Sequence, residues 1–400
     1  MDARSLQVRK PNSLAILLIA VIAISTLRIR SAIDRLPPDP GLDFFSEARQ
    51  EGFRVLFREE GGYLDLPRRI ISLAISRLSP EWWVIASNVI WLALVAGASA
   101  VIFRLILEVT SSRLAAFVAG VTYSLSPAAS ESQIGHDSVV KWVLLLSSIL
   151  VFSHPRTTRK LSMKTFALLV LSGVSNPLSF VLFVPLVTAN FSRIDHKRTI
   201  PLVYAGVLLL LSSLQFVAWR FSGQGVQKYA SDTTYAPWSG MGGFWIFNWL
   251  SGPVFAGVIL ALDALAVLKR RSSLLGELAH FRISLCLSSI GLWLTSYLLG
   301  GIGDRYFVVP QTLAWIAAIA LIYEHWGKRY TLTFVAAVLT VCMMFAGSLR
   351  WFSASTFLTA SPKWSSDVKI ARQKCSEEEI EFWIISQSIN EIEFRCELLR

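Results

Sequence analysis

The chain has 400 residues, of which 54% are hydrophobic and 16% are charged, and its mean hydropathy is +0.53. Soluble domains carry about 25% charged residues, so the composition excludes a soluble globular protein as well as a disordered chain, a collagen or a coiled coil. Four cysteines are too few for a disulfide framework. We therefore expect an integral membrane protein, whose net charge of +11 is distributed according to topology.

Ten apolar regions predict an all-α integral membrane protein, because a transmembrane helix needs about 20 apolar residues. Nine of them are continuous: 13–29, 82–107, 114–130, 138–153, 200–218, 250–268, 281–299, 307–323 and 331–348. No small-x-small cleavage site follows the first region, so we expect an anchor there and not a removed signal peptide. The tenth region, 165–190, is interrupted by Ser175-Asn176-Pro177. It is either one kinked crossing or a hairpin of two short helices.

The distribution of basic residues favours the hairpin. With a hairpin there are about eleven transmembrane segments, with the N-terminus cytoplasmic and the C-terminus external. Eighteen of the 38 basic residues then lie on the cytoplasmic side with only five of the 27 acidic residues. A single crossing would move the basic residues of 193–198 and 269–271 outside and remove this asymmetry. We expect a transmembrane domain over 1–348 and a small external module over 349–400.

A long external loop, about 28–81, is expected to contain two helices. Phe44, Phe45 and Ala48 indicate a short one. The segment 66–78 has a proline near its start and apolar residues at helical spacing. This pattern is typical of an amphipathic helix that lies in the headgroup layer with its arginines toward phosphates. The alternative is an interfacial helix with no part in a functional site.

The tail is expected to form a small α/β module. Residues 363–373 look helical, and 379–386 and 391–398 favour strands around a turn at 388–390. Cys375 would end the helix and Cys396 would lie in the last strand. In an oxidising compartment these two cysteines are expected to form a disulfide, the alternative being two free thiols. Cys286 and Cys342 fall within spans and are expected to be packing residues.

Polar residues gather at the outer ends of the expected spans. Converging on one cavity, they would supply carboxylates for base or metal chemistry and cations for a phosphate. They are Asp39, Asp43, Glu59, Glu60, Tyr63, Asp65, Glu131, His136, Asp137, Lys141, Asn176, Asp304, Arg305 and Tyr306. The alternatives are solvated loop carboxylates, a loop histidine at 136, and a Lys141 ammonium that reaches up to the interface. The chain has no glycine-rich phosphate loop, HExxH motif or nucleophile elbow, which leaves nucleotide hydrolysis and zinc proteolysis without support.

Several short motifs resemble those of the GT-C glycosyltransferases, in particular bacterial polytopic members. They are Asp39-Pro40-Gly41-Leu42-Asp43-Phe44, Gly61-Gly62-Tyr63-Leu64 before Pro67-Arg68-Arg69, Gly135-His136-Asp137 before Lys141-Trp142, Ser175-Asn176-Pro177, Asp304-Arg305-Tyr306-Phe307, and the Trp364 tail with its late cysteine. The similarity extends over nearly the full length of the chain.

The resemblance implies a cell-envelope transferase in the bacterial plasma membrane. It would move a sugar from a polyprenyl-phosphate donor to an acceptor glycan, lipid or protein at the external face. Asp39 or Asp43 would act as the base, and Arg68, Arg69 and Arg305 would bind the phosphate. The remaining substrate-binding candidates are Glu60, Tyr63, His136, Asp137, Lys141 and Tyr306. A divalent cation is left open, because the sequence contains no sufficient ligand set, and no nucleic-acid partner is expected.

Two other functions remain open. A transporter or flippase for a lipid-linked solute would need charged residues near the membrane midplane. Asp263 is the main candidate, but it lies near the inner end of its expected span, and the sequence shows no inverted repeats. We therefore favour the enzyme over the transporter. A catalytically inactive membrane protein is the third hypothesis.

Overall fold

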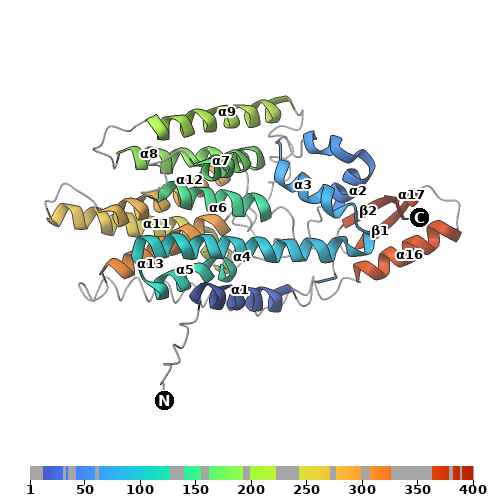
Figure 1. Cartoon of the computed structure of the whole chain (residues 1–400), viewed down its shortest axis with the longest axis horizontal. Coiled ribbons are helices and arrows are strands. Elements are labelled where there is room, and N and C mark those ends of the chain that lie inside the picture. The colour runs from blue at the N-terminus through green and yellow to red at the C-terminus, as the bar shows by residue number, and fades with distance from the viewer. Residues whose placement is uncertain are drawn as a thin grey trace, which may run out of the picture.

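The structure is a computed structural model, and most of it is a bundle of helices that run along the long axis of the molecule (Figure 1). The described residues are 12–29, 33–34, 42–58, 63–126, 139–154, 162–191, 199–221, 243–270, 276–298, 307–325, 363–377, 382–387 and 390–399. The helices of the bundle are α1 (Ser13–Ile29), α4 (Trp83–Thr110), α5 (Arg113–Leu125), α6 (Val139–Ser153), α7 (Met163–Ser175), α8 (Phe183–Phe191), α9 (Thr199–Phe221), α11 (Gly243–Arg270), α12 (Glu277–Leu298) and α13 (Val308–His325).

Four helical stretches of the described chain are long and apolar enough to cross a membrane. They are Pro80–Thr110, Ile200–Ala218, Glu277–Ser296 and Val308–His325. Other apolar helices are shorter than the expected spans. The 13 residues of α5, for example, rise only about 20 Å, whereas the hydrocarbon core is about 30 Å thick. The chain therefore has the helices of a membrane protein, and the count of eleven segments stays a prediction.

The turn between α4 and α5 shows how the local sequence sets the bundle. Ser111 ends α4 in the left-handed conformation, at φ 57°. Ser112 follows with extended backbone, and its hydroxyl accepts a hydrogen bond from the amide of Ala115 at 3.2 Å, which caps α5. Two serines thus replace a longer loop, and the two helices pack side by side in opposite directions.

The interrupted region 165–190 folds back on itself. The amide of Ser162 donates to the hydroxyl of Tyr204 at 3.3 Å, and Gln215 Nε2 donates to the carbonyl of Gly173 at 3.0 Å. Both pairs are 42 residues apart, so α7 and α9 run in the same direction. The chain between them must return. It does so through a 3₁₀ helix, η5 (Pro177–Leu182), and α8, whose end lies at the same end of the molecule as the start of α9 (Figure 1).

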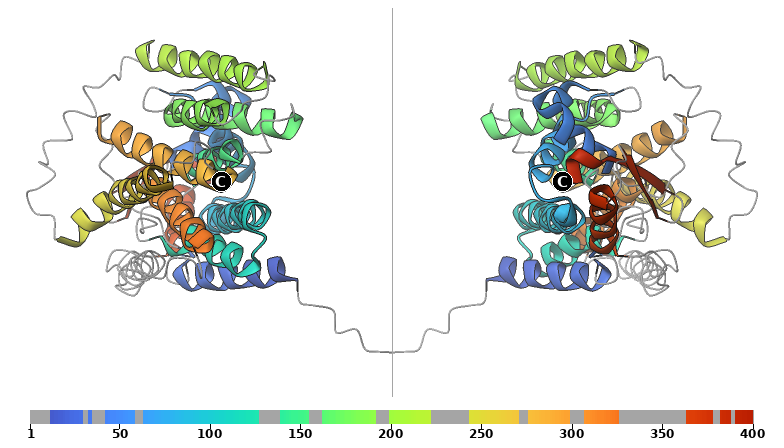
Figure 2. Two further views of the ribbon diagram at one scale, coloured as in Figure 1. Left: turned by 90° about the vertical axis from the view of Figure 1, so that its left-hand side faces the viewer. Right: turned by 90° about the vertical axis from the view of Figure 1, so that its right-hand side faces the viewer.

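The first loop and the tail pack together at one end of the bundle, seen from that end in Figure 2, right. The loop contributes α2 (Leu42–Glu51), η1 (Gly52–Phe57), α3 (Leu66–Ile75) and η2 (Pro80–Trp82). The tail contributes α16 (Trp364–Glu377), β1 (Phe382–Gln387), β2 (Asn390–Arg395) and α17 (Cys396–Leu399). Their buried apolar side chains form one cluster, which we call the loop–tail core: Phe45, Ile75, Trp83, Val84, Trp364, Val368, Ala371, Cys375, Cys396 and Leu399.

Hydrogen bonds fix Trp364 in the loop–tail core. Its indole Nε1 donates to the carbonyl of Pro80 at 2.8 Å, and its amide donates to the carbonyl of Asp34 at 2.8 Å. The hydroxyl of Ser365 donates to the Asp34 carboxylate at 2.6 Å. The start of the tail is therefore attached both to Asp34, in the segment that follows α1, and to Pro80, in η2 just before α4. We call this end of the molecule the loop end.

The tail elements lie close to where the sequence placed them. Strands β1 and β2 pair antiparallel, with Phe382 opposite Arg395 and Gln387 opposite Asn390. The second strand ends at Arg395 and Cys396 begins α17, so the expectation that Cys396 lies within the last strand is wrong. The chain turns into a helix there, which brings the Cys396 side chain over α16. The external position of this module stays a prediction.

Candidate functional site

Three of the candidate polar residues meet at the loop end of the bundle. Lys141 is the third residue of α6, and its Nζ donates to the hydroxyl of Tyr63 at 2.6 Å. The same Nζ lies 3.7 Å from Asp65 Oδ2 and 5.0 Å from the centre of the Tyr63 ring. The Asp65 side chain is fully buried and that of Lys141 is 11% exposed. We call Tyr63, Asp65 and Lys141 the Lys141 cluster.

The position of the Lys141 ammonium differs from one of the sequence alternatives. A lysine near the end of an apolar helix usually extends its ammonium toward water. Here Tyr63 and Asp65 lie over the start of α6 and bind Nζ inside the protein. A buried ammonium is tolerated because a carboxylate and a hydroxyl replace its lost water. The Lys141 cluster therefore holds the first loop against the bundle.

Gln215 provides the second attachment of the loop. Its Oε1 accepts from the amide of Leu64 at 3.0 Å, and its Nε2 donates to the carbonyl of Leu64 at 3.1 Å. The same Nε2 donates to the carbonyl of Gly173 on α7. The sequence analysis missed Gln215, because it treated the residue as part of an apolar span. A lone amide side chain near the end of an otherwise apolar span is the sequence signal that would have indicated it.

Both arginines of α3 are buried, at 3% exposure for Arg68 and 2% for Arg69. Arg69 Nη1 donates to Glu47 Oε2 on α2 at 2.7 Å. The other carboxylate oxygen of Glu47, Oε1, lies 3.3 Å from Arg58 Nη1. The expectation that both arginines face the lipid phosphates is wrong, because α3 packs against α2, α6 and α7 and turns this face inward. The cations of α3 thus lie inside the protein, in the helix that follows Asp65.

Asn176 marks the turn of the α7–α8 hairpin. Its Oδ1 accepts from the amide of Leu178 at 2.9 Å and so begins η5. The residue is 2% exposed, and the carbonyl bound by Gln215 lies only three residues before it. Asn176 therefore lies near the attachment of the first loop.

The other candidates are not placed. Asp39, Glu60, His136, Asp137, Arg305 and Tyr306 lie outside the described residues, and Asp43 is described only as part of the backbone of α2. Within the described part of the chain, no three His, Cys, Asp or Glu side chains are close enough to hold a metal ion. Among the described side chains, the structure thus brings together Tyr63, Asp65 and Lys141.

At the opposite end of the bundle, three charged residues connect α11, α12 and α13. Arg282 donates to Asp263 through Nη2 at 2.5 Å and through Nε at 3.2 Å, and its Nη1 pairs with Glu324. Arg282 and Asp263 are 2% and 6% exposed. The carboxylate that the transporter hypothesis relies on is therefore bound on both oxygens by one guanidinium.

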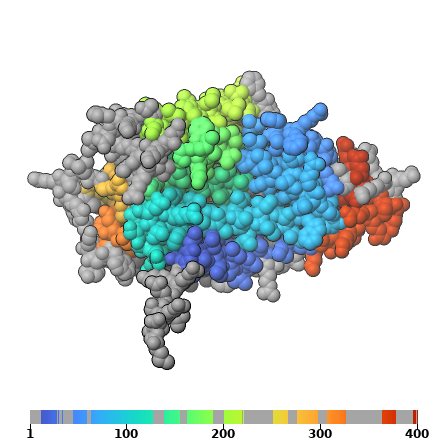
Figure 3. All heavy atoms as spheres, viewed as in Figure 1, coloured from blue at the N-terminus to red at the C-terminus, as the bar shows by residue number. Residues whose placement is uncertain are grey.

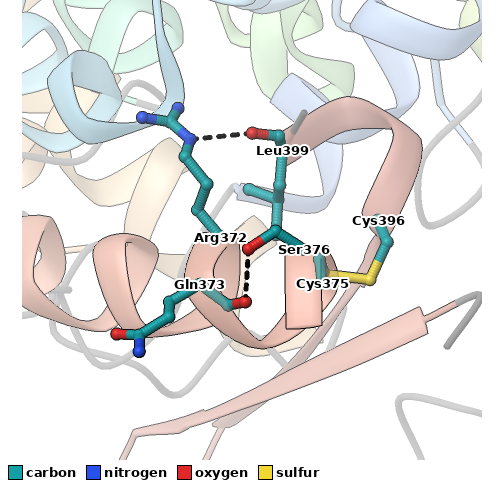
Figure 4. The surroundings of a disulfide bond; sticks show 6 residues. All are labelled: Arg372, Gln373, Cys375, Ser376, Cys396 and Leu399. Carbon is teal, nitrogen blue, oxygen red and sulfur yellow. Dashed lines mark hydrogen bonds between the residues drawn. A yellow bond between two sulfur atoms is a disulfide. The ribbon is translucent and has the colours of Figure 1, made fainter. Parts of the chain in front are cut away.

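The tail carries a disulfide between Cys375 and Cys396, the two cysteines that the sequence analysis paired (Figure 4). Arg372 Nε donates to the carbonyl of Leu399 at 2.7 Å and joins α16 to α17 a second time. Cys286 is a free thiol buried in the bundle.

No protein-family model, no curated protein and no solved structure matches this chain. The function therefore has to be argued from the residues.

Proposed function

We propose that the chain is a membrane glycosyltransferase of the GT-C type. It would transfer a sugar from a polyprenyl-phosphate donor to an acceptor at the external face of a bacterial plasma membrane. One observation carries the proposal: the long first loop is fixed onto α6 and α9 by Asp65, Tyr63 and Leu64, and it continues into α3, whose Arg68 and Arg69 are buried. Loops held by a rigid helical scaffold are where catalytic groups are expected.

The proposed chemistry needs a base for the acceptor hydroxyl and cations for the leaving phosphate. Asp39 or Asp43 accepts the proton of the acceptor hydroxyl as its oxygen bonds to the anomeric carbon of the sugar. The bond from that carbon to the phosphate oxygen breaks, and its electron pair leaves with the lipid phosphate. Arg68, Arg69 and Arg305 supply positive charge near that oxygen and so lower the energy of the departing anion, while Lys141, whose charge is matched by Asp65, positions the loop.

The proposed topology has eleven segments, a cytoplasmic N-terminus and an external C-terminus. Two observations support it. The loop and the tail share one core, so they lie on the same side of the membrane. The tail also contains a disulfide, and disulfides persist in oxidising compartments outside the cytoplasm.

Sugar transfer by the purified protein tests the proposal. The protein in lipid nanodiscs is incubated with a panel of polyprenyl-phosphate sugars, and the release of polyprenyl phosphate is measured. We expect D39N, D43N or the double variant to lose at least about a hundredfold in rate, as general-base removal does. E397Q is the matched control, because Glu397 is 71% exposed on α17 of the tail. Transfer by the double variant at the wild-type rate would remove both assigned bases.

The transporter hypothesis makes a different prediction. Solute movement without cleavage of the sugar–phosphate bond, abolished by D263N, would support it. We favour the enzyme because Arg282 already neutralises Asp263 in the structure.

A further inference from the structure

The short helix η1 exposes two large aromatic side chains. Phe53 is 70% exposed and Phe57 is 83% exposed, whereas Val55 between them is fully buried. Val55 attaches η1 to the protein, and the two phenyl rings extend away from it. Burial of a phenylalanine side chain contributes about 1.5–3 kcal/mol, so two exposed rings on one short helix indicate a surface that contacts something apolar.

The depth of η1 follows from the attachment of the loop. Leu64 is bonded to Gln215, which lies three residues before the end of the membrane-compatible stretch Ile200–Ala218. Phe57 precedes Leu64 by seven residues, so it lies within about 25 Å of that level. In Figure 3 the blue surface of the first loop lies directly beside the yellow-green surface at the end of α9. The attachment of the first loop therefore lies near the end of a membrane-compatible helix.

Apolar side chains at the end of α9, where Leu64 is attached, indicate the kind of partner. The end of α9 exposes Leu214, Phe216 and Val217 at 46%, 61% and 48%, and the only apolar medium expected around a membrane-compatible helix is lipid. Arg54, also exposed, lies between the two phenylalanines. Aromatic rings with an intervening arginine are suited to the headgroup layer, where the rings enter the acyl boundary and the guanidinium meets phosphate.

We propose that η1 is the interfacial anchor of the first loop, with Phe53 and Phe57 inserted at the headgroup–acyl boundary of the surrounding bilayer and Arg54 bound to lipid phosphate. The sequence predicted this role for 66–78, but Arg68 and Arg69 of that segment are buried. The anchor fixes the depth of α2, which directly precedes η1. This inference does not depend on the proposed enzymatic activity.

Spin-label accessibility tests the anchor in the full chain. Cys286 and Cys342 are replaced by alanine, the disulfide is kept, and a nitroxide is attached to F57C in nanodiscs with anionic lipid. The matched control is I370C, because Ile370 is 54% exposed on α16 in the tail. Collisions are measured with oxygen, which concentrates in lipid, and with a water-soluble nickel chelate. We expect a several-fold higher oxygen-to-nickel ratio at 57 than at 370, and the same at F53C.

Two outcomes would overturn the proposal. A ratio at 57 equal to that at 370 would place η1 in water. Low collision rates with both reagents would show that protein, either another part of this chain or a second copy, covers the rings. Arg54 is tested by adding R54E to the F57C variant. We expect the ratio at 57 to fall in anionic nanodiscs and to fall less in zwitterionic ones, whose phosphates are offset by a headgroup cation. An unchanged ratio in both lipids would contradict the phosphate contact.

Discussion

A lysine inside a bundle of apolar helices is stable only while its charge is matched. Lys141 has the carboxylate of Asp65 and the hydroxyl of Tyr63 within reach, and both come from a segment about 80 residues earlier in the chain. The sequence identified all three residues as candidates. It did not predict that they meet, because nothing in a linear pattern specifies which loop residue lies over the start of α6.

The charge match at Lys141 makes a prediction about stability. Lys141→Met leaves the fully buried Asp65 without its nearby ammonium, so we expect the free energy of unfolding to fall by about 3–5 kcal/mol. Asp65→Asn added to this variant should recover most of the loss, since no buried charge remains. Thermal unfolding in detergent measures both.

Lys363→Met is the control for Lys141→Met, because Lys363 is exposed at the start of α16. We expect it to change the free energy by less than about 0.5 kcal/mol. Equal effects of the two lysine substitutions would mean that the Lys141 cluster does not stabilise the fold.

At the scale of helices, the close approach of α7 and α9 depends on Gly173. A Cβ at this position would lie 2.6 Å from Leu211 Cδ1 and 3.0 Å from Leu211 Cβ. Gly206 lies on α9, as Leu211 does, and a Cβ there would meet nothing within 4 Å. The two glycines therefore form a matched pair, one in a tight contact and one in open space.

Alanine at the two glycines should have opposite effects. Gly206→Ala removes the cost of a helical glycine and is expected to raise the free energy of unfolding by up to about 1 kcal/mol. Gly173→Ala gains the same term but forces the helices apart, and we expect a net loss of about 1–2 kcal/mol. Leu211→Ala added to Gly173→Ala should weaken that effect. Chemical or thermal unfolding would show it, and a stabilising Gly173→Ala would contradict the observed packing.

Element types were easier to predict than element surroundings. The helical period of 66–78 and the composition of the tail indicated α3, α16 and the strand pair. The inward position of Arg69 was not predictable, because it depends on Glu47, which belongs to a different helix. A helix that faces headgroups and a helix with paired, buried arginines can share one amphipathic pattern.

At the scale of the molecule, the two ends of the bundle are predicted to face different compartments. Lys164 is exposed at the start of α7, and Lys363 is exposed at the start of α16. With the native free thiols replaced, we expect an impermeant thiol reagent on intact cells to label Lys363→Cys and not Lys164→Cys. Labelling of Lys164→Cys alone would invert the topology, and labelling of both would reject opposite sides for these positions.

Charge counts suggested that the first loop and the tail share a side of the membrane, but they did not suggest a shared core. The bond from Trp364 to the Pro80 carbonyl connects residues 284 positions apart. Contacts of such long sequence separation leave no local periodicity, and so no pattern in either segment indicates the other. The contacts within the Lys141 cluster and the contact of Gln215 with Leu64 could not be predicted for the same reason.

The contact between Asp34 and Ser365 spans 331 residues, and this imposes an order on biosynthesis. When the ribosome has synthesised the first loop, Trp364, which completes the loop–tail core, has not yet been translated. The apolar side chains of Phe45 and Trp83 therefore stay exposed until the bundle has formed and the last residues have been synthesised. Folding of the first loop is thereby a late step of assembly, and a chain that terminates early would leave this loop as a target for quality-control proteases.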